Sequence, residues 1–264
     1  MIADKSPKII PAERRKMILQ VLQGRQFVSS LELCDILCAS ESTVRRDLEL
    51  LEESGAIERV HGGAVLTKHL NIESLYSQSK LTNEVEKRRI AEYACSLIQP
   101  NDVVFMNHGT TTTMIAQALT SRTDLSSVTI ISSNLGVIGA LFETDVNLIC
   151  LGGLCRKQSF SITGGITLSN IESFVANKCF LGVDGIDVKF GGTFFTEKDS
   201  EVSKAMAQNT HGQIYVVADH DKWGTVSPYK GIQFSRVNSF ITGKELDEQI
   251  DLVFKEHGVD LYRV

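Results

Sequence analysis

The chain has 264 residues, of which 42% are hydrophobic and 22% are charged, and this composition is typical of a globular protein with room for two domains. No apolar run reaches the roughly 18 residues of a membrane helix, and the first residues lack the apolar core of a secretory signal, so we expect a cytoplasmic protein without a membrane partner. The net charge of −5 excludes a protein that is basic over its whole surface.

The negative charge is uneven along the chain. Residues 1–68 hold ten lysines and arginines and ten aspartates and glutamates, so the whole deficit lies beyond them. Any DNA binding by the first part must therefore come from the placement of basic side chains on one face.

The first 68 residues predict three short helices followed by a β-hairpin. Pro11 begins an amphipathic segment that Gly24 ends, because proline suits the first turn of a helix and glycine its end. Ser29 and Glu32 form the S-x-x-E pattern of a capping box at the start of a second helix.

The third helix is expected over "STVRRDLELLEESG", residues 42–55. Its aliphatic residues recur at i, i+4 and i+7, which places one stripe of the helix in a core: Val44, Leu48 and Leu51. The polar side chains off that stripe near the helix start are Ser42, Thr43, Arg45 and Arg46. Arginine can pair with guanine or hold a phosphate, and hydroxyls at a helix start suit the same partners, so we predict that these four residues contact DNA.

A less specific interpretation of the arginines is that they pair with glutamates of the same helix on a solvated face. Asp47 is expected to hold an arginine in position, because phosphate repels a carboxylate. Two short apolar runs around Gly62-Gly63 then predict a hairpin, with Arg59 and His61 at its bend contacting the DNA backbone. Helix, helix, turn, helix and hairpin are the order of a winged helix-turn-helix.

The chain beyond residue 84 has the pattern of an α/β domain with a parallel sheet. A helix is expected at about 84–98, and apolar runs then alternate with helical or loop segments: "VVFM", "VTIIS", "NLICL", "CFLGV", "IYVVAD", "SFIT" and "DLYRV". A last helix has the apolar face Leu246, Ile250, Val253 and Phe254. We therefore assign 1–68 to a DNA-binding domain, 69–83 to a linker and 84–264 to an α/β domain.

The loops that follow the predicted strands indicate a small-molecule site. In "MNHGTTTT" a strand ends and a glycine and hydroxyl run begin a helix, whose free N–H groups can bind a phosphate. The effector-binding residues predicted in these loops are Asn107, Gly109, Thr110, Thr111, Thr112, Ser133, Asn134, Gly152 and Gly153. The alternative is a set of ordinary strand-to-helix turns capped by threonine.

Further along the chain, lysines and an acidic motif add candidates to the same site. Lys178 could neutralise a phosphate, and Lys222, with Asp219, is a second cation candidate. In "GVDGID", Asp184 could accept hydrogen bonds from sugar hydroxyls, with Gly182 and Gly185 beside it. The alternative for each lysine is a solvated surface charge, and His108 is either an acid–base group or a structural histidine.

The six cysteines show no CxxC pair. Cys34 and Cys38 share a helical face, but no neighbouring histidine or second pair completes a zinc site. We expect no metal and no cofactor.

Two long stretches resemble the DeoR family of bacterial sugar-metabolism repressors. "ESTVRRDLELLEESGAIERVHGGA" is similar to the family's N-terminal domain, with its T-[IV]-R-R-D-L and R-x-H-G-G-A motifs. "NHGTTTT", "SSN", "LGG", "NKCFLGVDGID", "TEKDSEVSKAMA" and "ADHDKWG" resemble its sensor domain in the same order. The resemblance implies a sensor similar in fold to ribose-5-phosphate isomerase and glucosamine-6-phosphate deaminase, and a response to phosphorylated sugars.

The chain departs from the family pattern at four positions. The family often has Asp where this chain has Asn107, Asn177 or Gly243, and it often has Ala or Ser where this chain has His108. The departures imply an unusual ligand or altered binding.

Two functions fit these observations. The first is a transcriptional regulator, a repressor of an operon for carbohydrate uptake or catabolism, that binds double-stranded operator DNA as a dimer or tetramer under control of a phosphorylated sugar. The second is a sugar-phosphate isomerase or deaminase, since Asp184 and Asp187 keep the spacing of the Asp-Gly-x-Asp motif of those enzymes. A recognition helix serves no purpose in an enzyme, so we expect the regulator; the sugar, the operator and the direction of the response stay open.

Overall fold

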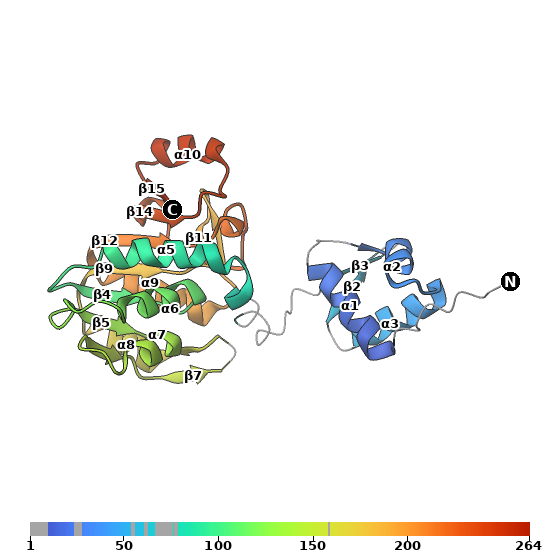
Figure 1. Ribbon diagram of the computed structural model, residues 1–264, viewed down its shortest axis with the longest axis horizontal. Helices are drawn as coiled ribbons and strands as arrows, with labels where there is room; N and C mark the ends of the chain where they lie inside the picture. The colour runs from blue at the N-terminus through green and yellow to red at the C-terminus, as the bar shows by residue number, and fades with distance from the viewer. Residues whose placement is uncertain are drawn as a thin grey trace. The chain divides into compact units, whose positions relative to one another are not determined.

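The computed structural model describes residues 10–23, 28–53, 56–60, 63–66, 76, 79–157 and 159–264. The chain divides into two compact units, Met1–Ser74 and Leu75–Val264, and the boundary between them falls within residues 69–83, which were predicted to be a linker (Figure 1). Each unit has a hydrophobic core of its own. In the part of the chain that is described, no helix is both long and apolar enough to cross a bilayer.

The N-terminal unit contains the three helices and the hairpin that the sequence predicts. Its elements are α1 (Pro11–Gln23), β1 (Val28–Ser29), α2 (Ser30–Leu37), α3 (Glu41–Glu53), β2 (Ile57–Val60) and β3 (Gly63–Leu66). The capping box is confirmed, because the Glu32 N–H donates to Ser29 Oγ and the Ser29 N–H donates to Glu32 Oε2, both at 3.2 Å. Gly24, expected to end the first helix, and Gly55, the last residue of the range expected for the third helix, lie outside the described residues.

The core of this unit explains how α3 is held. The predicted stripe is buried together with residues of the other two helices and the hairpin: Val44, Leu48, Leu51, Ile18, Leu22, Leu33, Leu37, Ile57 and Ala64. β1, which is too short to predict from its sequence, pairs antiparallel with β3 and gives the sheet order β1-β3-β2.

The C-terminal unit is built on a seven-stranded parallel sheet, as predicted. Its strands are β4 (Val103–Met106), β5 (Thr129–Ser132), β6 (Asn147–Cys150), β9 (Ala176–Leu181), β12 (Thr210–Val217), β14 (Ser239–Thr242) and β15 (Asp260–Arg263). The spatial order is β15-β14-β12-β9-β4-β5-β6, so the chain first builds outwards from β4 to β6 and then returns to place β9 on the other side of β4. The strand order therefore reverses between β4 and β9.

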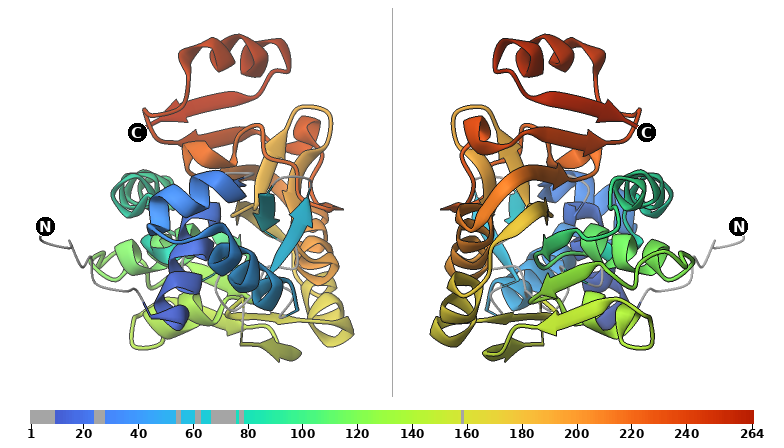
Figure 2. Two further views of the ribbon diagram at one scale, coloured as in Figure 1. Left: turned by 90° about the vertical axis from the view of Figure 1, so that its right-hand side faces the viewer. Right: turned by 90° about the vertical axis from the view of Figure 1, so that its left-hand side faces the viewer.

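Helices cover both faces of this sheet (Figures 1 and 2). One face packs against α5 (Glu84–Ser96), α6 (Thr110–Leu119) and α7 (Leu135–Leu141), and the other against α8 (Gly165–Glu172) and α9 (Glu197–Gln208). Side chains of β4 alternate between the two faces. Val104 and Met106 pack in the core on the side of α5, α6 and α7, and Phe105 packs in the core on the side of α8 and α9. Buried on both sides, the sheet holds its strand ends in fixed positions.

Smaller elements complete the unit. They are the antiparallel sheet of β10 (Gly185–Asp187), β11 (Gly191–Phe194) and β13 (Tyr229–Lys230), the pair β7 (Leu154–Arg156) and β8 (Ser161–Thr163), and the 3-10 turns η1 (His220–Lys222), η2 (Phe234–Arg236) and η3 (Glu248–Ile250). The last helix, α10, covers only Asp251–Glu256, so it begins five residues after Leu246, the first residue of the helical face that the sequence predicts. The reason is local: Asp247 Oδ1 accepts a hydrogen bond from the Gln249 N–H and starts η3 instead.

Candidate functional site

The exposed side of α3 carries the side chains predicted to contact DNA. Ser42, Arg45 and Arg46 are exposed and Thr43 is half-buried, on the side of the helix opposite to its buried stripe. Ser40, just before the helix, shares hydrogen bonds with the hydroxyls of Ser42 and Thr43 at 3.1 and 2.8 Å. The start of the helix therefore presents hydroxyls and cations together.

The two arginines differ in their surroundings. Arg45 Nε donates to Glu49 Oε1 at 3.2 Å, and Arg59 Nη1 of β2 lies 3.5 Å from the same oxygen. The glutamate pairing considered for both arginines thus holds for Arg45, although exposed pairs of this kind contribute little stability. Arg46 has no ion pair or hydrogen bond to any of the described residues through its side chain, and His61 lies outside those residues.

Asp47 has the role that the sequence predicts for it. It is 2% exposed and forms an ion pair with Arg14 of α1, and Arg15 Nη1 lies 3.6 Å from its Oδ1. The carboxylate therefore fixes α3 to α1 and is turned away from the exposed side that carries Arg46.

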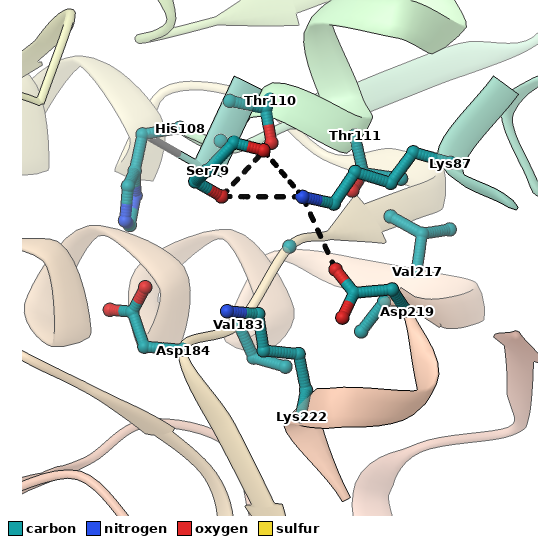
Figure 3. Close-up of a pocket in the computed structure, with 13 residues that line it drawn as sticks. Ser79, Lys87, His108, Thr110, Thr111, Val183, Asp184, Val217, Asp219 and Lys222 are labelled. Carbon is teal, nitrogen blue, oxygen red and sulfur yellow. Dashed lines mark hydrogen bonds and ion pairs between the residues drawn. The ribbon is translucent and has the colours of Figure 1, made fainter. Parts of the chain in front are cut away.

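A cavity opens at the carboxyl ends of β4, β9 and β12, where the strand order reverses (Figure 3). In open parallel sheets, ligands bind in the crevice at such a switch point. The cavity has a volume of about 50 Å³ and is lined by Ser79, Lys87, His108, Gly109, Thr110, Thr111, Gly182, Val183, Asp184, Val217, Ala218, Asp219 and Lys222. Six of the predicted effector residues thus meet in one place: Gly109, Thr110, Thr111, Gly182, Asp184 and Lys222.

The helix start at α6 and a lysine give the cavity a positive character. Gly109 precedes α6 at φ +139°, a conformation that favours glycine, and it leaves the first N–H groups of the helix uncovered by a side chain. Lys222 extends from η1 between Asp184 and the Lys87–Asp219 pair (Figure 3). Its ammonium makes no hydrogen bond or ion pair with the described part of the chain, although the residue is only half exposed.

Lys87, on α5, is almost fully buried and is satisfied by the protein itself. Its Nζ donates to the carbonyl oxygens of Ser79 at 2.6 Å and Thr82 at 2.9 Å, and lies 3.2 Å from Asp219 Oδ2. Burial lowers the pKa of this ammonium, and the charge of Asp219 offsets only part of that effect.

Asp184 and His108 lie on the other side of the cavity (Figure 3). Asp184 Oδ2 accepts a hydrogen bond from the Phe195 N–H at 2.9 Å, and burial raises the pKa of the carboxyl group. Behind His108 lies Asp199, 3.9 Å from its Nδ1; burial acts to raise the pKa of Asp199, but His108, Thr196 and Arg156 outweigh it and the pKa is lowered. Groups of this kind can accept hydrogen bonds from hydroxyls.

Three predicted residues support the cavity from behind and do not line it. Asn107 donates to the Gly182 carbonyl at 2.8 Å and accepts from the Gly182 N–H at 2.8 Å, which ties β4 to β9. Asn134 Nδ2 donates to the Gly109 carbonyl at 2.9 Å, and Thr112 Oγ1 donates to the Asn107 carbonyl at 2.9 Å. These contacts fix the loops at the strand ends, so the three residues belong to the framework.

Four other predicted residues do not line the cavity either. Ser133 is buried, two residues before the start of α7, and its Oγ has no hydrogen-bond partner among the described residues. Gly152 and Gly153 pack against α8: the Gly152 N–H donates to Asn170 Oδ1 at 3.0 Å, and a Cβ on Gly153 would lie 2.1 Å from Thr167 Oγ1. Gly185 is needed for close packing, since its Cβ would lie 2.3 Å from the Thr225 carbonyl oxygen.

Lys178 does not line the cavity. Its Nζ lies 2.5 Å from Asp102 Oδ2 and donates to the Leu97 carbonyl at 2.7 Å, and Asp102 directly precedes β4. The side chain therefore lies at the amino ends of the strands, opposite to the cavity. Lys178 stands four residues before Gly182, and at about 3.3 Å per residue the strand carries it about 13 Å from the site.

The sequence interpretation missed Lys87 and Ser79. Lys87 stands three and four residues before Ile90 and Ala91, so it lies on the apolar stripe of its own helix. A lysine on a buried stripe is a signal that could have identified it. Ser79 offered no comparable signal.

The departures from the family pattern have structural explanations at two positions. Asn177 Nδ2 donates to Asp102 Oδ1 at 2.7 Å, where a second carboxylate would be repelled. A Cβ at Gly243 would lie 2.2 Å from Glu245 Oε2 and 2.3 Å from Glu86 Oε1, so these glutamates occupy the space that an aspartate would need. Neither position lines the cavity, so neither departure alters the cavity wall.

A winged helix-turn-helix joined to an α/β unit with a cavity at its strand ends is the arrangement of a class of protein, the transcriptional regulators that carry their own small-molecule sensor. Residues 14–69 match the DeoR-like helix-turn-helix domain and residues 82–244 match the DeoR C terminal sensor domain, and the chain belongs to the DeoR family. No group of three or more histidine, cysteine or acidic side chains in the described ranges could hold a metal ion.

Individual relatives agree with this assignment. The chain is 31% identical to the HTH-type transcriptional regulator FruR of Bacillus subtilis, over 83% of this chain and 86% of that protein. It is 30% identical to the HTH-type transcriptional repressor GlcR of the same organism, over 94% of this chain and 95% of that protein. Among solved structures, ribose 5-phosphate isomerase A of Methanocaldococcus jannaschii matches 54% of this chain and 55% of that one, with a TM-score of 0.40 and 16% identity.

Proposed function

We propose that this protein is a repressor of a carbohydrate operon, and that a phosphorylated sugar bound in the cavity changes its affinity for operator DNA. Arg46, Arg45, Ser42 and Thr43 of α3 would contact the major groove, with Arg59 and His61 on the phosphates of the backbone. The relatives named as repressors, GlcR and a putative aga operon repressor of Escherichia coli, support a repressor role.

The observation that carries the effector proposal is the ammonium of Lys222, which has no hydrogen bond or ion pair with the described residues, at a cavity that also contains the start of α6. A phosphate would accept hydrogen bonds from the Thr110 and Thr111 N–H groups and pair with Lys222. Asp184 and His108, on the opposite side, would then contact the hydroxyls of the sugar.

A thermal-shift screen tests the effector proposal directly. The purified full-length chain is heated with hexose, hexitol, amino-sugar and pentose phosphates, with the unphosphorylated sugars and inorganic phosphate as controls. A ligand present at about 100 times its Kd should add roughly 2.7 kcal/mol of stability. A shift with one phosphorylated compound and not with its parent sugar is the expected result, and no shift with any compound would overturn the proposal.

We propose further that the protein does not turn over sugar phosphates. Of the two aspartates that resemble those of the isomerases, Asp187 caps a turn, since its Oδ1 accepts from the N–H groups of Lys189 at 2.8 Å and Phe190 at 3.0 Å. That carboxylate is thus engaged in the turn, and of the two aspartates of the motif only Asp184 lines the cavity. The other carboxylate of the described lining, Asp219, is paired with Lys87. Incubation with ribose 5-phosphate and glucosamine 6-phosphate should yield no product.

The proposal also implies an oligomer that acts where the chromosome is, in the cytoplasm. One winged helix-turn-helix reads few base pairs, so a dimer or tetramer on repeated half-sites would supply the specificity. Light scattering of the free protein and of its complex with DNA measures this directly.

A further inference from the structure

The cavity is joined to the interdomain linker through Lys87. The carbonyl oxygens that accept from its ammonium belong to Ser79 and Thr82, which precede α5 in the chain. Lys87 Nζ also lies 3.4 Å from Ser79 Oγ (Figure 3). A side chain of the cavity therefore holds the stretch of chain that leads to the N-terminal unit.

The same stretch touches the start of α6 directly. Ser79 Oγ lies 3.4 Å from Thr110 Oγ1, and Ser79 is the one described lining residue of the cavity that comes from before α5. Further back, the Tyr76 hydroxyl lies 3.2 Å from Thr113 Oγ1, and its ring stacks on Phe160 with centroids 5.4 Å apart. We call Tyr76, Ser79 and Thr82 the linker anchor.

The linker anchor occupies part of the place where the phosphate is proposed to bind. The enclosed part of the cavity, about 50 Å³, holds a few water molecules, and Ser79 lies beside Thr110 at the start of α6. Most of the remaining wall comes from the carboxyl ends of β4, β9 and β12 and from the first turn of α6, which the two cores hold in place. Ser79 is the part of the wall that can leave without unfolding either core.

We propose that the effector displaces the linker anchor: its phosphate takes the place of Ser79 beside Thr110, and Lys87 exchanges the Ser79 and Thr82 carbonyls for the phosphate oxygens. This inference rests on the proposed function, because it assigns a consequence to the same ligand at the same site. Asn83 stays in place, since its Nδ2 donates to Asp219 at 3.1 Å and Asp221 at 2.8 Å, so release ends at the start of α5. Ligand and anchor compete, and the signal passes through the chain itself to the DNA-binding unit.

The first test needs no ligand. Lys87→Met keeps the length of the side chain but removes the cation that holds the carbonyls, and Arg88→Met removes a cation from the next residue, which is exposed and pairs with Glu84. Hydrogen–deuterium exchange is measured over residues 79–83, together with affinity for a DNA fragment selected by the wild-type protein from a random library. We expect exchange about tenfold faster and a changed DNA affinity in Lys87→Met, with neither change in Arg88→Met. Wild-type exchange and affinity in Lys87→Met would overturn the proposal.

Because Lys87→Met leaves Asp219 buried without its cation, the double variant Lys87→Met/Asp219→Asn is measured beside it.

A second approach locks the anchor instead of releasing it. Ser79→Cys/Thr110→Cys places two thiols where the hydroxyls are 3.4 Å apart, within reach of a disulfide. Four native cysteines that are not buried are replaced by serine in this variant: Cys34, Cys38, Cys150 and Cys155.

The oxidised form of the locked variant should still bind the selected DNA. The sugar phosphate that stabilises the wild type should neither raise the Tm of this oxidised form nor change its DNA affinity. Reduction of the disulfide should restore both responses to the sugar phosphate. A ligand response that is equal in the oxidised and reduced forms would overturn the proposal. The two failures are distinguishable, because a wrong effector assignment removes the wild-type thermal shift, whereas a wrong anchor leaves that shift and abolishes the difference between Lys87→Met and Arg88→Met.

Discussion

Asp47 of α3 is buried against Arg14 of α1, so the carboxylate that follows the two exposed arginines is turned into the N-terminal unit and not towards solvent. This pair sets the orientation of α3 across 33 residues of sequence. We predict that Asp47→Ala lowers the free energy of unfolding by about 2 kcal/mol, because it leaves Arg14 without its carboxylate in a largely buried place. Glu49→Ala, on the exposed side of the same helix, should cost less than about 0.5 kcal/mol. Urea denaturation of both variants measures the difference, and equal costs would contradict the orienting role.

Arg46 is expected to carry specific DNA recognition. Its guanidinium is exposed and makes no pair in the part of the chain described, so it can meet a guanine edge or a phosphate without breaking a contact. Arg46→Ala should weaken binding to the selected DNA fragment at least about tenfold in a gel-shift assay, since one good bidentate contact is worth roughly 1–3 kcal/mol. The thermal shift with sugar phosphate should be unchanged in this variant. Wild-type affinity for the fragment would show that α3 does not read the DNA.

The two lysines that the sequence offered for the phosphate are expected to behave differently. Lys222→Met should weaken binding of the stabilising sugar phosphate about tenfold or more, because it removes the cavity ammonium that has no partner among the described residues. Lys178→Met should leave that affinity unchanged and lower the stability of the free protein instead, because it breaks the pair with Asp102 at the far ends of the strands. Isothermal titration calorimetry and thermal melting separate the two effects. A weakened ligand affinity in Lys178→Met alone would reverse this assignment.

His220 is expected to make the stability of the sensor unit depend on pH. Burial acts to lower the pKa of its imidazole, but the hydrogen bond and charge of Glu86, 2.8 Å away, outweigh it and raise the pKa above its ordinary value of 6.5. A raised pKa in the folded state contributes stability that is fully present below pH 6.5 and is lost as the pH rises through the raised value.

His220→Gln removes the titrating group and keeps a donor for Glu86. We expect the Tm difference between wild type and this variant to be larger at pH 6 than at pH 9, in melts with matched ionic strength. The Asp124 carboxylate, whose pKa is lowered by its pair with Arg122 and which stays ionised across this range, provides a control through Asp124→Asn, whose Tm difference should be the same at both pH values. A constant difference for His220→Gln would contradict the assigned shift.

The sequence by itself determined the features whose cause is local. The spacing of Val44, Leu48 and Leu51 specifies which side of α3 is buried, and therefore that Arg45 and Arg46 are exposed. The capping box of Ser29 and Glu32 and the apolar runs of the parallel sheet were likewise predictable, because backbone hydrogen bonding and side-chain period act over a few residues.

The tertiary structure decided which polar residues meet. Lys178 and Lys222 looked equivalent as candidates, but strand direction carries Lys178 to the amino ends of the sheet and the turn after β12 brings Lys222 to the cavity. Lys87 became part of the site because Asp219, 132 positions further along the chain, lies beside α5 once β12 is placed next to β9. Contacts of this kind depend on the order of strands in the sheet, which long-range packing sets and which no local pattern of residues encodes.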